Sequence, residues 1–173
     1  MSDLGHDIKK LGFGLMRLPK LDEKTIDVEQ TKQMVDMFMH AGFTYFDTAW
    51  AYAGSEDAIR QALVERYPRE SFQLATKNAA WINCKTKEEA HAQFETSLKQ
   101  TGAGYFDFYL LHNLGESRTE FFDRFDLWNW LVDSHGRKRA DQCIKCGKCE
   151  AVCPQHIAIR EHLDEVTAKL LAE

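Results

Sequence analysis

The chain has 173 residues, of which 44% are hydrophobic and 12% aromatic, proportions that are ordinary for a soluble globular protein. Its formal net charge of -5 and pI of about 5.8 argue against a nucleic-acid-binding face, and the one basic cluster, Arg137-Lys138-Arg139, is short. The polar start of the chain lacks the pattern of a signal peptide, and no apolar run reaches the roughly 18 residues that span a bilayer. We therefore expect a soluble cytoplasmic protein.

The first third of the chain predicts a strand, a helix and a second strand. Residues 11–16 form a short apolar run with two glycines, which permit close backbone approach by a neighbour or a ligand. Asp27 is a typical N-cap, and apolar residues then recur at helical spacing until Gly42 ends the helix. A second apolar run, residues 43–46, predicts a buried strand that stops at Asp47.

The middle of the chain repeats this order. Ser55 is a candidate N-cap for a second helix, which Pro68 stops. Residues 72–76 predict a third strand, and it ends at Lys77.

A third unit follows directly. Thr86, with a glutamate three residues later, forms a capping box for a helix that Gly102 ends. The nearly continuous apolar and aromatic run at 105–111 predicts a fourth strand, which ends at His112, and the spacing of apolar residues predicts one helix over 119–134.

Strand and helix thus alternate four times, with a repeat of about 30 residues, the size of a βαβ unit. The strands are apolar enough to be buried on both faces, which is typical of a parallel sheet. The fold class that we predict is α/β with parallel strands.

Three polar residues each follow one of these strands: Asp47, Lys77 and His112. Ligands of parallel β/α folds bind outside the carboxyl ends of the strands, so these side chains should converge there, with Tyr52 on the loop above them. Taken singly, a surface lysine and a structural histidine are the simpler interpretations. Together, an acid, a base, a phenol and an imidazole at that edge predict an active site.

At these residues the chain resembles the aldo-keto reductases, which are NAD(P)H-dependent carbonyl reductases built on a (β/α)8 barrel. The resemblance covers about residues 8–134 and rests on four segments in the family's order. They are Leu11-Gly-Phe-Gly14, Phe46-Asp-Thr-Ala-Trp-Ala-Tyr52, Ala75-Thr-Lys77 and Tyr105-Phe-Asp-Phe-Tyr-Leu-Leu-His112.

The resemblance implies a catalytic tetrad of Asp47, Tyr52, Lys77 and His112, and a nicotinamide cofactor, NADPH or NADH, over Gly14 and Asp47. Tyr52 would protonate the carbonyl oxygen of a small substrate as hydride arrives at the carbon. The Lys77 ammonium would favour release of that proton, and Asp47 would hold the ammonium in place. His112 would orient and polarise the carbonyl oxygen.

A second motif lies near the C-terminus. The run Cys143-x-x-Cys146-x-x-Cys149-x-x-x-Cys153-Pro matches the bacterial ferredoxin pattern and predicts a 4Fe-4S cluster held by these four cysteines. Zinc and disulfides are weaker interpretations, because zinc sites usually space two ligand pairs further apart. Whether the fourth cysteine closes the same cluster stays open. A short amphipathic helix is predicted after the motif, and one branch of the aldo-keto reductases carries such a C-terminal segment.

The number of β/α units departs from the family. A complete (β/α)8 barrel has about 250 residues, whereas four units precede the cysteines here. The sequence therefore predicts a shortened form with a half barrel at 1–136 and an iron–sulfur segment at 137–173. A homodimer that closes the barrel, a flattened open sheet, or an inactive form would each accommodate this.

Two further alternatives stay open. In the first, the chain is an NAD(P)H-dependent oxidoreductase with an iron–sulfur cluster. In the second, it is a non-catalytic or electron-transfer iron–sulfur protein with its own electron-transfer partner, and its tetrad is an unused relic. Trp50 and Trp81, on loops after the second and third strands, either line a pocket for an apolar carbonyl substrate or pack the loops.

Overall fold

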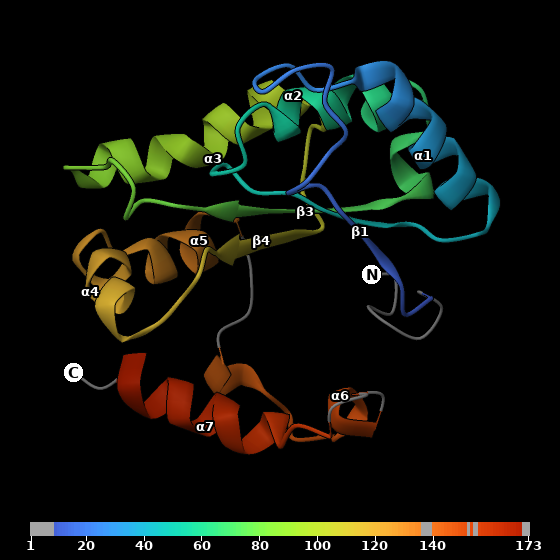
Figure 1. The fold of residues 1–173 in the computed structure, drawn as a ribbon. Coiled ribbons are helices and arrows are strands. Elements are labelled where there is room, and N and C mark those ends of the chain that lie inside the picture. Colours follow the sequence, from blue (N-terminus) through green and yellow to red (C-terminus); the bar gives the residue numbers. More distant parts are fainter. Residues whose placement is uncertain (1–8, 136–139, 152, 154–155, 171–173) are drawn as a thin grey trace. The chain divides into compact units, whose positions relative to one another are not determined.

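The computed structural model describes residues 9–135, 140–151, 153 and 156–170, which form two compact units, 1–127 and 128–173 (Figure 1). The basic run Arg137-Lys138-Arg139 and Pro154 lie outside the described residues. Along the part of the chain that is described, no helix is long and apolar enough to cross a membrane.

The first unit is built on a four-stranded parallel sheet, so the predicted α/β class is confirmed (Figure 1). Its strands are β1 (Gly12–Gly14), β2 (Tyr45–Asp47), β3 (Gln73–Asn78) and β4 (Phe108–Leu111), and their order in the sheet is their order in the chain. Strand order that follows chain order is typical of a (β/α) barrel, whereas a doubly wound sheet reverses its order at one point.

The glycine at the start of β1 makes room for an aromatic ring. A Cβ on Gly12 would lie 2.8 Å from Cδ1 of Tyr45, which is the partner of Gly12 in the register of the two strands. The Tyr45 ring in turn packs edge-on against Phe108, at 5.6 Å between centroids. This contact places aromatic side chains on the sheet face opposite to the helices.

Two helices begin and end as the sequence predicts. In α1 (Val28–His40), the Asp27 carboxylate accepts a hydrogen bond from the Gln30 amide at 2.9 Å, and Gly42 follows with a φ of +77°. In α3 (Lys87–Thr101), Thr86 accepts from the Glu89 amide and Gly102 ends the helix in the left-handed conformation. Only half of the predicted capping box forms, because the Glu89 carboxylate accepts from the amide of Lys85 instead.

The second helix starts one residue earlier than predicted. Gly54 is the N-cap of α2 (Ser55–Ile59), which continues as a π-helical stretch, Arg60–Val64. Ser55 is the first helical residue rather than the cap. Its buried hydroxyl lies 2.7 Å from that of Thr48 and donates to the Leu15 carbonyl at 3.2 Å. The prediction was wrong because Ser55 ties together the loops that leave β1 and β2.

The hydrophobic core lies between the sheet and the first helices. Phe46 and Leu74 are fully buried and alternate along their strands with residues of the opposite sheet face, as a pleated strand requires. Burying such a side chain stabilises the fold by about 1.5–3 kcal/mol. The other large buried members of this cluster are Leu15, Leu18, Val35, Ile59, Leu63, Phe72 and Phe106.

One predicted helix is in fact two. The helix expected over 119–134 is divided into α4 (Glu116–Arg124) and α5 (Leu127–His135). Asp126 stands at the break with a φ of +50°, a conformation that an α-helix does not contain and that Asp tolerates better than most residues. Its carboxylate accepts from Lys87 Nζ at 2.9 Å, so the break is fixed by a contact with α3 that no local pattern contains.

The second unit contains short helices. After a 3₁₀ turn, Ala140–Gln142, come α6 (Lys148–Ala151) and α7 (Ile159–Leu170), and α7 confirms the predicted amphipathic helix. Glu150 ties the two helices together, because its carboxylate accepts from the amide and from Nε of Arg160 at 2.7 and 2.9 Å.

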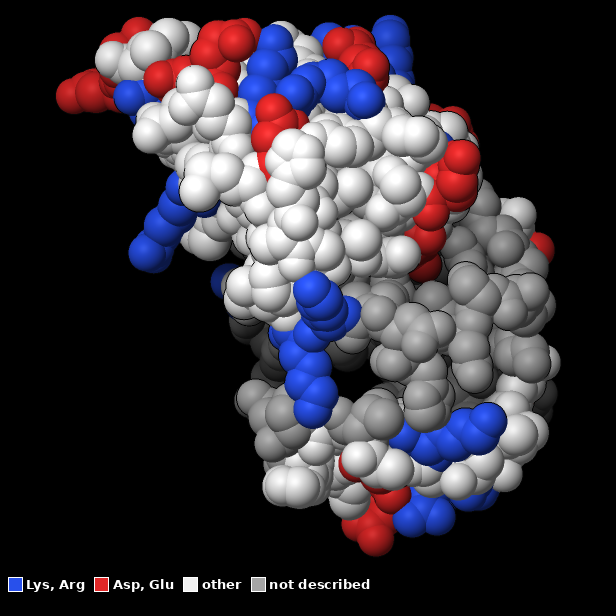
Figure 2. Space-filling model, turned by 90° about the vertical axis from the view of Figure 1, so that its right-hand side faces the viewer, with Lys and Arg blue, Asp and Glu red and all other residues white. Residues whose placement is uncertain are grey.

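Charged side chains of both signs are mixed on one face of the molecule. On the face shown in Figure 2, acidic and basic residues lie next to one another and do not gather into one large patch of either sign. This agrees with the modest net charge of -5.

A glutamate is buried between α2, β3 and α3. Glu56 is 3% exposed, and Thr76 donates to its Oε1 at 2.6 Å. In the described residues, its Oε2 and the buried hydroxyl of Ser97 lack hydrogen-bond partners of good geometry. Burial raises the pKa of the Glu56 carboxyl, and the hydrogen bond from Thr76 offsets part of this rise.

We predict that ionisation of Glu56 lowers the free energy of unfolding of the wild type as the pH rises, and that Glu56→Gln abolishes this loss. The unfolded chain releases the Glu56 proton near its ordinary pKa of 4.5, whereas the folded chain releases it at a higher pH. The free energy of unfolding of the wild type should therefore fall, relative to that of Glu56→Gln, as the pH rises above about 4.5. Urea unfolding of both proteins from pH 4 to 8 measures this difference. A difference that does not vary with pH would contradict it.

Candidate active site

The four residues predicted for the active site lie together at the carboxyl edge of the sheet. Asp47 is the last residue of β2, and Lys77 lies in β3, which runs further than expected. His112 directly follows β4, and its amide donates to the Asn78 carbonyl at 2.8 Å. Tyr52 lies on the loop between β2 and α2. Parallel strands place these residues at one edge, as the sequence predicts.

An ion pair lies at the centre of this group. Lys77 Nζ donates to Asp47 Oδ1 at 2.5 Å and to the Thr48 carbonyl at 2.7 Å. The side chain of Lys77 is 14% exposed and that of Asp47 is 30% exposed, so water reaches the pair only in part. Two oxygens therefore fix the position of the ammonium group.

The ammonium group lies against the phenol ring. Lys77 Nζ is 5.3 Å from the centroid of the Tyr52 ring. The rings of Tyr52 and His112 are 5.4 Å apart and nearly perpendicular, at 86°. In the described part of the chain, the Tyr52 hydroxyl has no hydrogen-bond partner. The phenol thus lies close to both a fixed cation and an imidazole, and no described residue accepts its proton.

The surroundings of His112 favour its neutral form. Burial lowers the pKa of His112 below its ordinary value of 6.5, the charge of Lys77 lowers it further, and Asp47 opposes this. Its Nδ1 is buried and, in the described residues, makes no hydrogen bond. A neutral imidazole can donate one hydrogen bond to a substrate oxygen without adding a charge to the site.

A tryptophan and an arginine extend the site beyond the predicted residues. Trp81 donates from Nε1 to the His112 carbonyl at 2.9 Å, and its ring is 6.2 Å from the imidazole. The Arg118 guanidinium lies 4.4 Å from the centroid of the Trp81 indole. Arg118 was not among the residues predicted from the sequence. The available signal was a basic residue in the first turn of the helix after His112, where acidic residues are favoured.

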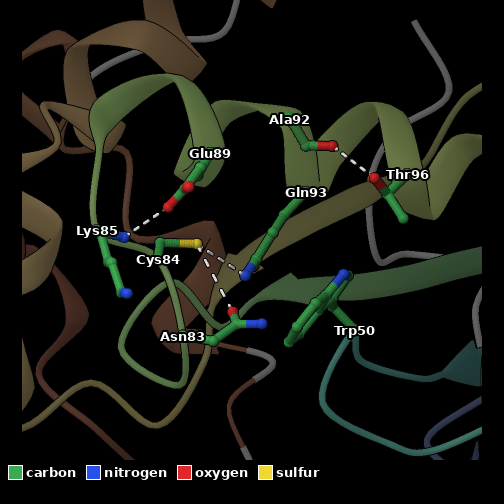
Figure 3. A pocket seen from close by; sticks show the side chains of 8 residues that line it. All are labelled: Trp50, Asn83, Cys84, Lys85, Glu89, Ala92, Gln93 and Thr96. Carbon is green, nitrogen blue, oxygen red and sulfur yellow. Dashed lines mark hydrogen bonds between the residues drawn. The ribbon is translucent and has the colours of Figure 1, made fainter.

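Trp50 borders two cavities. The larger has a volume of about 460 Å³ and lies between α3 and the loop before it (Figure 3). On its wall, the thiol of Cys84 accepts from Gln93 Nε2 at 3.2 Å. The smaller, about 280 Å³, is lined by Tyr52 and Glu56 as well as Trp50. Trp50 therefore borders open space, whereas Trp81 packs beside His112.

The end of β1 is open beside the ion pair. Gly14 is the register partner of Asp47. A Cβ on Gly14 would meet no atom within 4 Å, so none of the described residues packs there. The backbone at Gly14 is accessible to a planar ligand that approaches the Asp47–Lys77 pair.

The cysteine segment has the right donors but not an assembled metal site. Lys145 and Gly147 have positive φ angles, and the Lys145 amide donates to Cys143 Sγ at 3.4 Å, a contact of the kind that stabilises cluster sulfurs. Cys146 and Cys149 are exposed. Over the described ranges, no three His, Cys, Asp or Glu side chains gather to hold a metal ion. Four thiols fit a cluster in type and spacing, and metal segments commonly fold around their metal.

Comparison with known proteins identifies the family. The sequence pattern of the Aldo/keto reductase family matches residues 10–164, which is most of the chain. The chain belongs to this family. The resemblance inferred from the four segments is thereby confirmed, whereas the iron–sulfur branch stays a prediction.

Two relatives illustrate the similarity to other aldo-keto reductases. One from Mycolicibacterium smegmatis is 29% identical over 136 residues, which are 79% of this chain and 46% of that protein. Aldo-keto reductase family 1 member C21 from Rattus norvegicus is 31% identical over 161 residues, or 86% of this chain and 44% of that protein. The chain thus spans about half the length of the relatives that it matches.

Solved structures of aldo-keto reductases share the fold. A Klebsiella pneumoniae aldo-keto reductase in complex with NADPH is 25% identical, with a TM-score of 0.57 over 73% of this chain and 42% of that one. An aldo-keto reductase from Pseudomonas aeruginosa is 20% identical, with a TM-score of 0.60 over 77% of this chain and 54% of that one. The four β/α units of this chain therefore correspond to part of an aldo-keto reductase barrel.

We predict that Lys77→Met raises the pKa of His112. The substitution removes a positive charge that lowers this pKa and leaves Asp47, which raises it. An NMR titration of the imidazole measures the change. Lys87→Met is the matched control, because it removes a lysine whose ion pair, with Asp126, lies away from the site. An unchanged His112 pKa in Lys77→Met would show that the two residues are not coupled.

Proposed function

We propose that the chain serves in the NADPH- or NADH-dependent reduction of a small carbonyl compound to an alcohol. The observation that carries the proposal is the Lys77 ammonium, fixed by Asp47 and placed against the Tyr52 ring, with the His112 ring 5.4 Å from that of Tyr52. We assign residues 1–136 to this reductase part and residues 137–173 to an iron–sulfur part.

Tyr52 would act as the proton donor. Hydride reaches the carbonyl carbon, negative charge develops on the oxygen, and the phenol transfers its proton to that oxygen to complete the alcohol. The phenolate that remains would lie beside the fixed ammonium of Lys77 and regain a proton from water. His112, neutral and with a ring nitrogen to donate, would hold the carbonyl oxygen in place and stabilise the developing charge.

Gly14 and Asp47 are the residues that we assign to cofactor binding. The open space beside Gly14 leaves room for a flat ring at the end of β1, next to the ion pair. A bound nicotinamide cofactor would supply the hydride. The described part of the chain would supply the four tetrad residues around the nicotinamide. We assign no residues to the rest of the nucleotide.

A second copy of the chain is the partner that we propose for the sheet. In the described residues, β1 and β4 are the outer strands of the sheet, and each pairs with one neighbour only. Unpaired strand edges favour association with a further strand. Two copies could pair β4 of one with β1 of the other and close an eight-stranded barrel.

For the C-terminal part, we propose a 4Fe-4S cluster held by Cys143, Cys146, Cys149 and Cys153. The cluster would supply one-electron chemistry or a structural link, and a reducing cytoplasm would keep the thiols available. A second candidate function follows from this segment, namely electron transfer to a partner protein without carbonyl reduction. Turnover of NADPH with an aldehyde distinguishes the two.

We predict that Tyr52→Phe lowers the rate of carbonyl reduction by at least about 100-fold, because the variant has no proton to give. NADPH oxidation with an aromatic aldehyde measures the rate, and NADPH affinity should stay nearly the same. Tyr105→Phe is the matched control, since Tyr105 is 49% exposed and packs against Arg69, away from the tetrad. Turnover by Tyr52→Phe equal to that of the wild type would remove Tyr52 from the mechanism.

We predict that Cys146→Ser lowers the iron content of anaerobically purified protein and removes its brown absorbance. A serine hydroxyl binds the iron of a cluster much more weakly than a cysteine thiolate does. Cys84→Ser is the control, because Cys84 lies in the first unit beside Gln93 and belongs to no proposed ligand set. Full iron content in Cys146→Ser would end the cluster proposal.

A further inference from the structure

Among the residues that the structure describes, the candidate active site contains a cation without a partner anion. Lys77 is paired with Asp47, and the lowered pKa of His112 favours the neutral imidazole. Arg118 is different: within the described ranges, no carboxylate forms an ion pair with its guanidinium, which lies over the Trp81 ring. The described charged groups near His112 therefore sum to a net positive charge.

Contacts with the indole place Arg118 in the same site as the tetrad. Trp81 donates to the His112 carbonyl, and its ring contacts the imidazole. Arg118 stacks on that same indole. Its charge is also close enough to lower the pKa of His112, after burial and Lys77. Tyr52, His112, Trp81 and Arg118 thus form a continuous row, with an aromatic wall between the imidazole and the guanidinium.

The position of Arg118 opposes local preference. It is the third residue of α4 (Glu116–Arg124), and a cation near a helix N-terminus is disfavoured by the helix dipole. In this chain, no described carboxylate compensates that cost. Residues that break a local rule without a structural gain are expected at binding sites.

Guanidinium chemistry indicates the ligand. The planar group presents parallel N–H donors that match the two oxygens of a carboxylate, and stacking on an aromatic ring leaves those donors free at its edge. Arg118 supplies a single positive charge, which balances the single charge of a carboxylate better than the double charge of a phosphate ester.

We propose that Arg118 binds a carboxylate group of the substrate, so that the site selects carbonyl compounds that carry one. This rests on the proposed reductase function and names its substrate class. The carbonyl oxygen would lie between Tyr52 and His112, the body of the substrate along Trp81, and the carboxylate at Arg118. Arg118 is thus a specificity-determining residue.

Two aldehydes of similar size test the proposal, 4-carboxybenzaldehyde and the neutral 4-methylbenzaldehyde, each with NADPH. Arg118→Gln should lower kcat/KM for the carboxylate about tenfold or more relative to the methyl compound, the effect expected for a lost hydrogen bond to a charged group. The loss of kcat/KM in Arg118→Lys should lie in between, because lysine keeps the positive charge but lacks the parallel N–H donors of the guanidinium. Arg124→Gln, at the exposed end of the same helix, should match the wild type.

An equal loss for both aldehydes, or a raised KM for NADPH alone, would overturn the proposal. Binding is measured separately, by quenching of tryptophan fluorescence as each aldehyde is added. If 4-carboxybenzaldehyde binds more tightly than 4-methylbenzaldehyde, and only while Arg118 is present, the carboxylate site holds even when no NADPH is oxidised, and the reductase function alone fails. If the two aldehydes bind equally to wild type and Arg118→Gln, the carboxylate site fails even where reduction continues.

Discussion

The ion pair between Lys77 and Asp47 determines how the rest of the site is arranged. An ammonium group that is largely removed from water needs a close anion, since an unpaired buried charge costs several kcal/mol. Asp47 meets that need only because β2 and β3 are parallel and in a register that pairs Asp47 with Ala75, two residues before Lys77 on the same sheet face. The ammonium is then held beside the Tyr52 ring. Strand register is thus the structural origin of the proposed chemistry.

One face of the sheet packs the hydrophobic core, and the other carries the candidate active site. Phe46 and Leu74 point to the helices and are fully buried. Asp47 follows Phe46 in β2, and Lys77 lies in the same strand as Leu74, but both point to the other face of the sheet. The loops that leave the strands are anchored by buried hydroxyls, as Ser55 shows with its bonds to Thr48 and Leu15. A rigid outer layer therefore holds a polar edge whose side chains keep free donors for a ligand.

Local chemistry in the sequence predicted much of this arrangement. Asp27, Thr86 and Gly102 fixed helix ends because a cap depends on residues within one turn. Polar residues after apolar runs located the site because parallel strands must align their carboxyl ends. Features that depend on contacts between distant segments were missed: the break at Asp126, held by Lys87, and the row from His112 through Trp81 to Arg118. The cysteine spacing stays a prediction, since the described thiols are not gathered.

The central claim is that the Asp47–Lys77–Tyr52–His112 group works with a nicotinamide cofactor. Titration of NADPH and NADH into anaerobically purified protein, followed by the fluorescence of the reduced nicotinamide, tests it most directly, with the mass in solution determined on the same sample. We expect saturable binding below millimolar nucleotide, by a species with twice the mass of one chain. No binding of either nucleotide at millimolar concentration would contradict it and would leave the cysteine segment as the functional part of the chain.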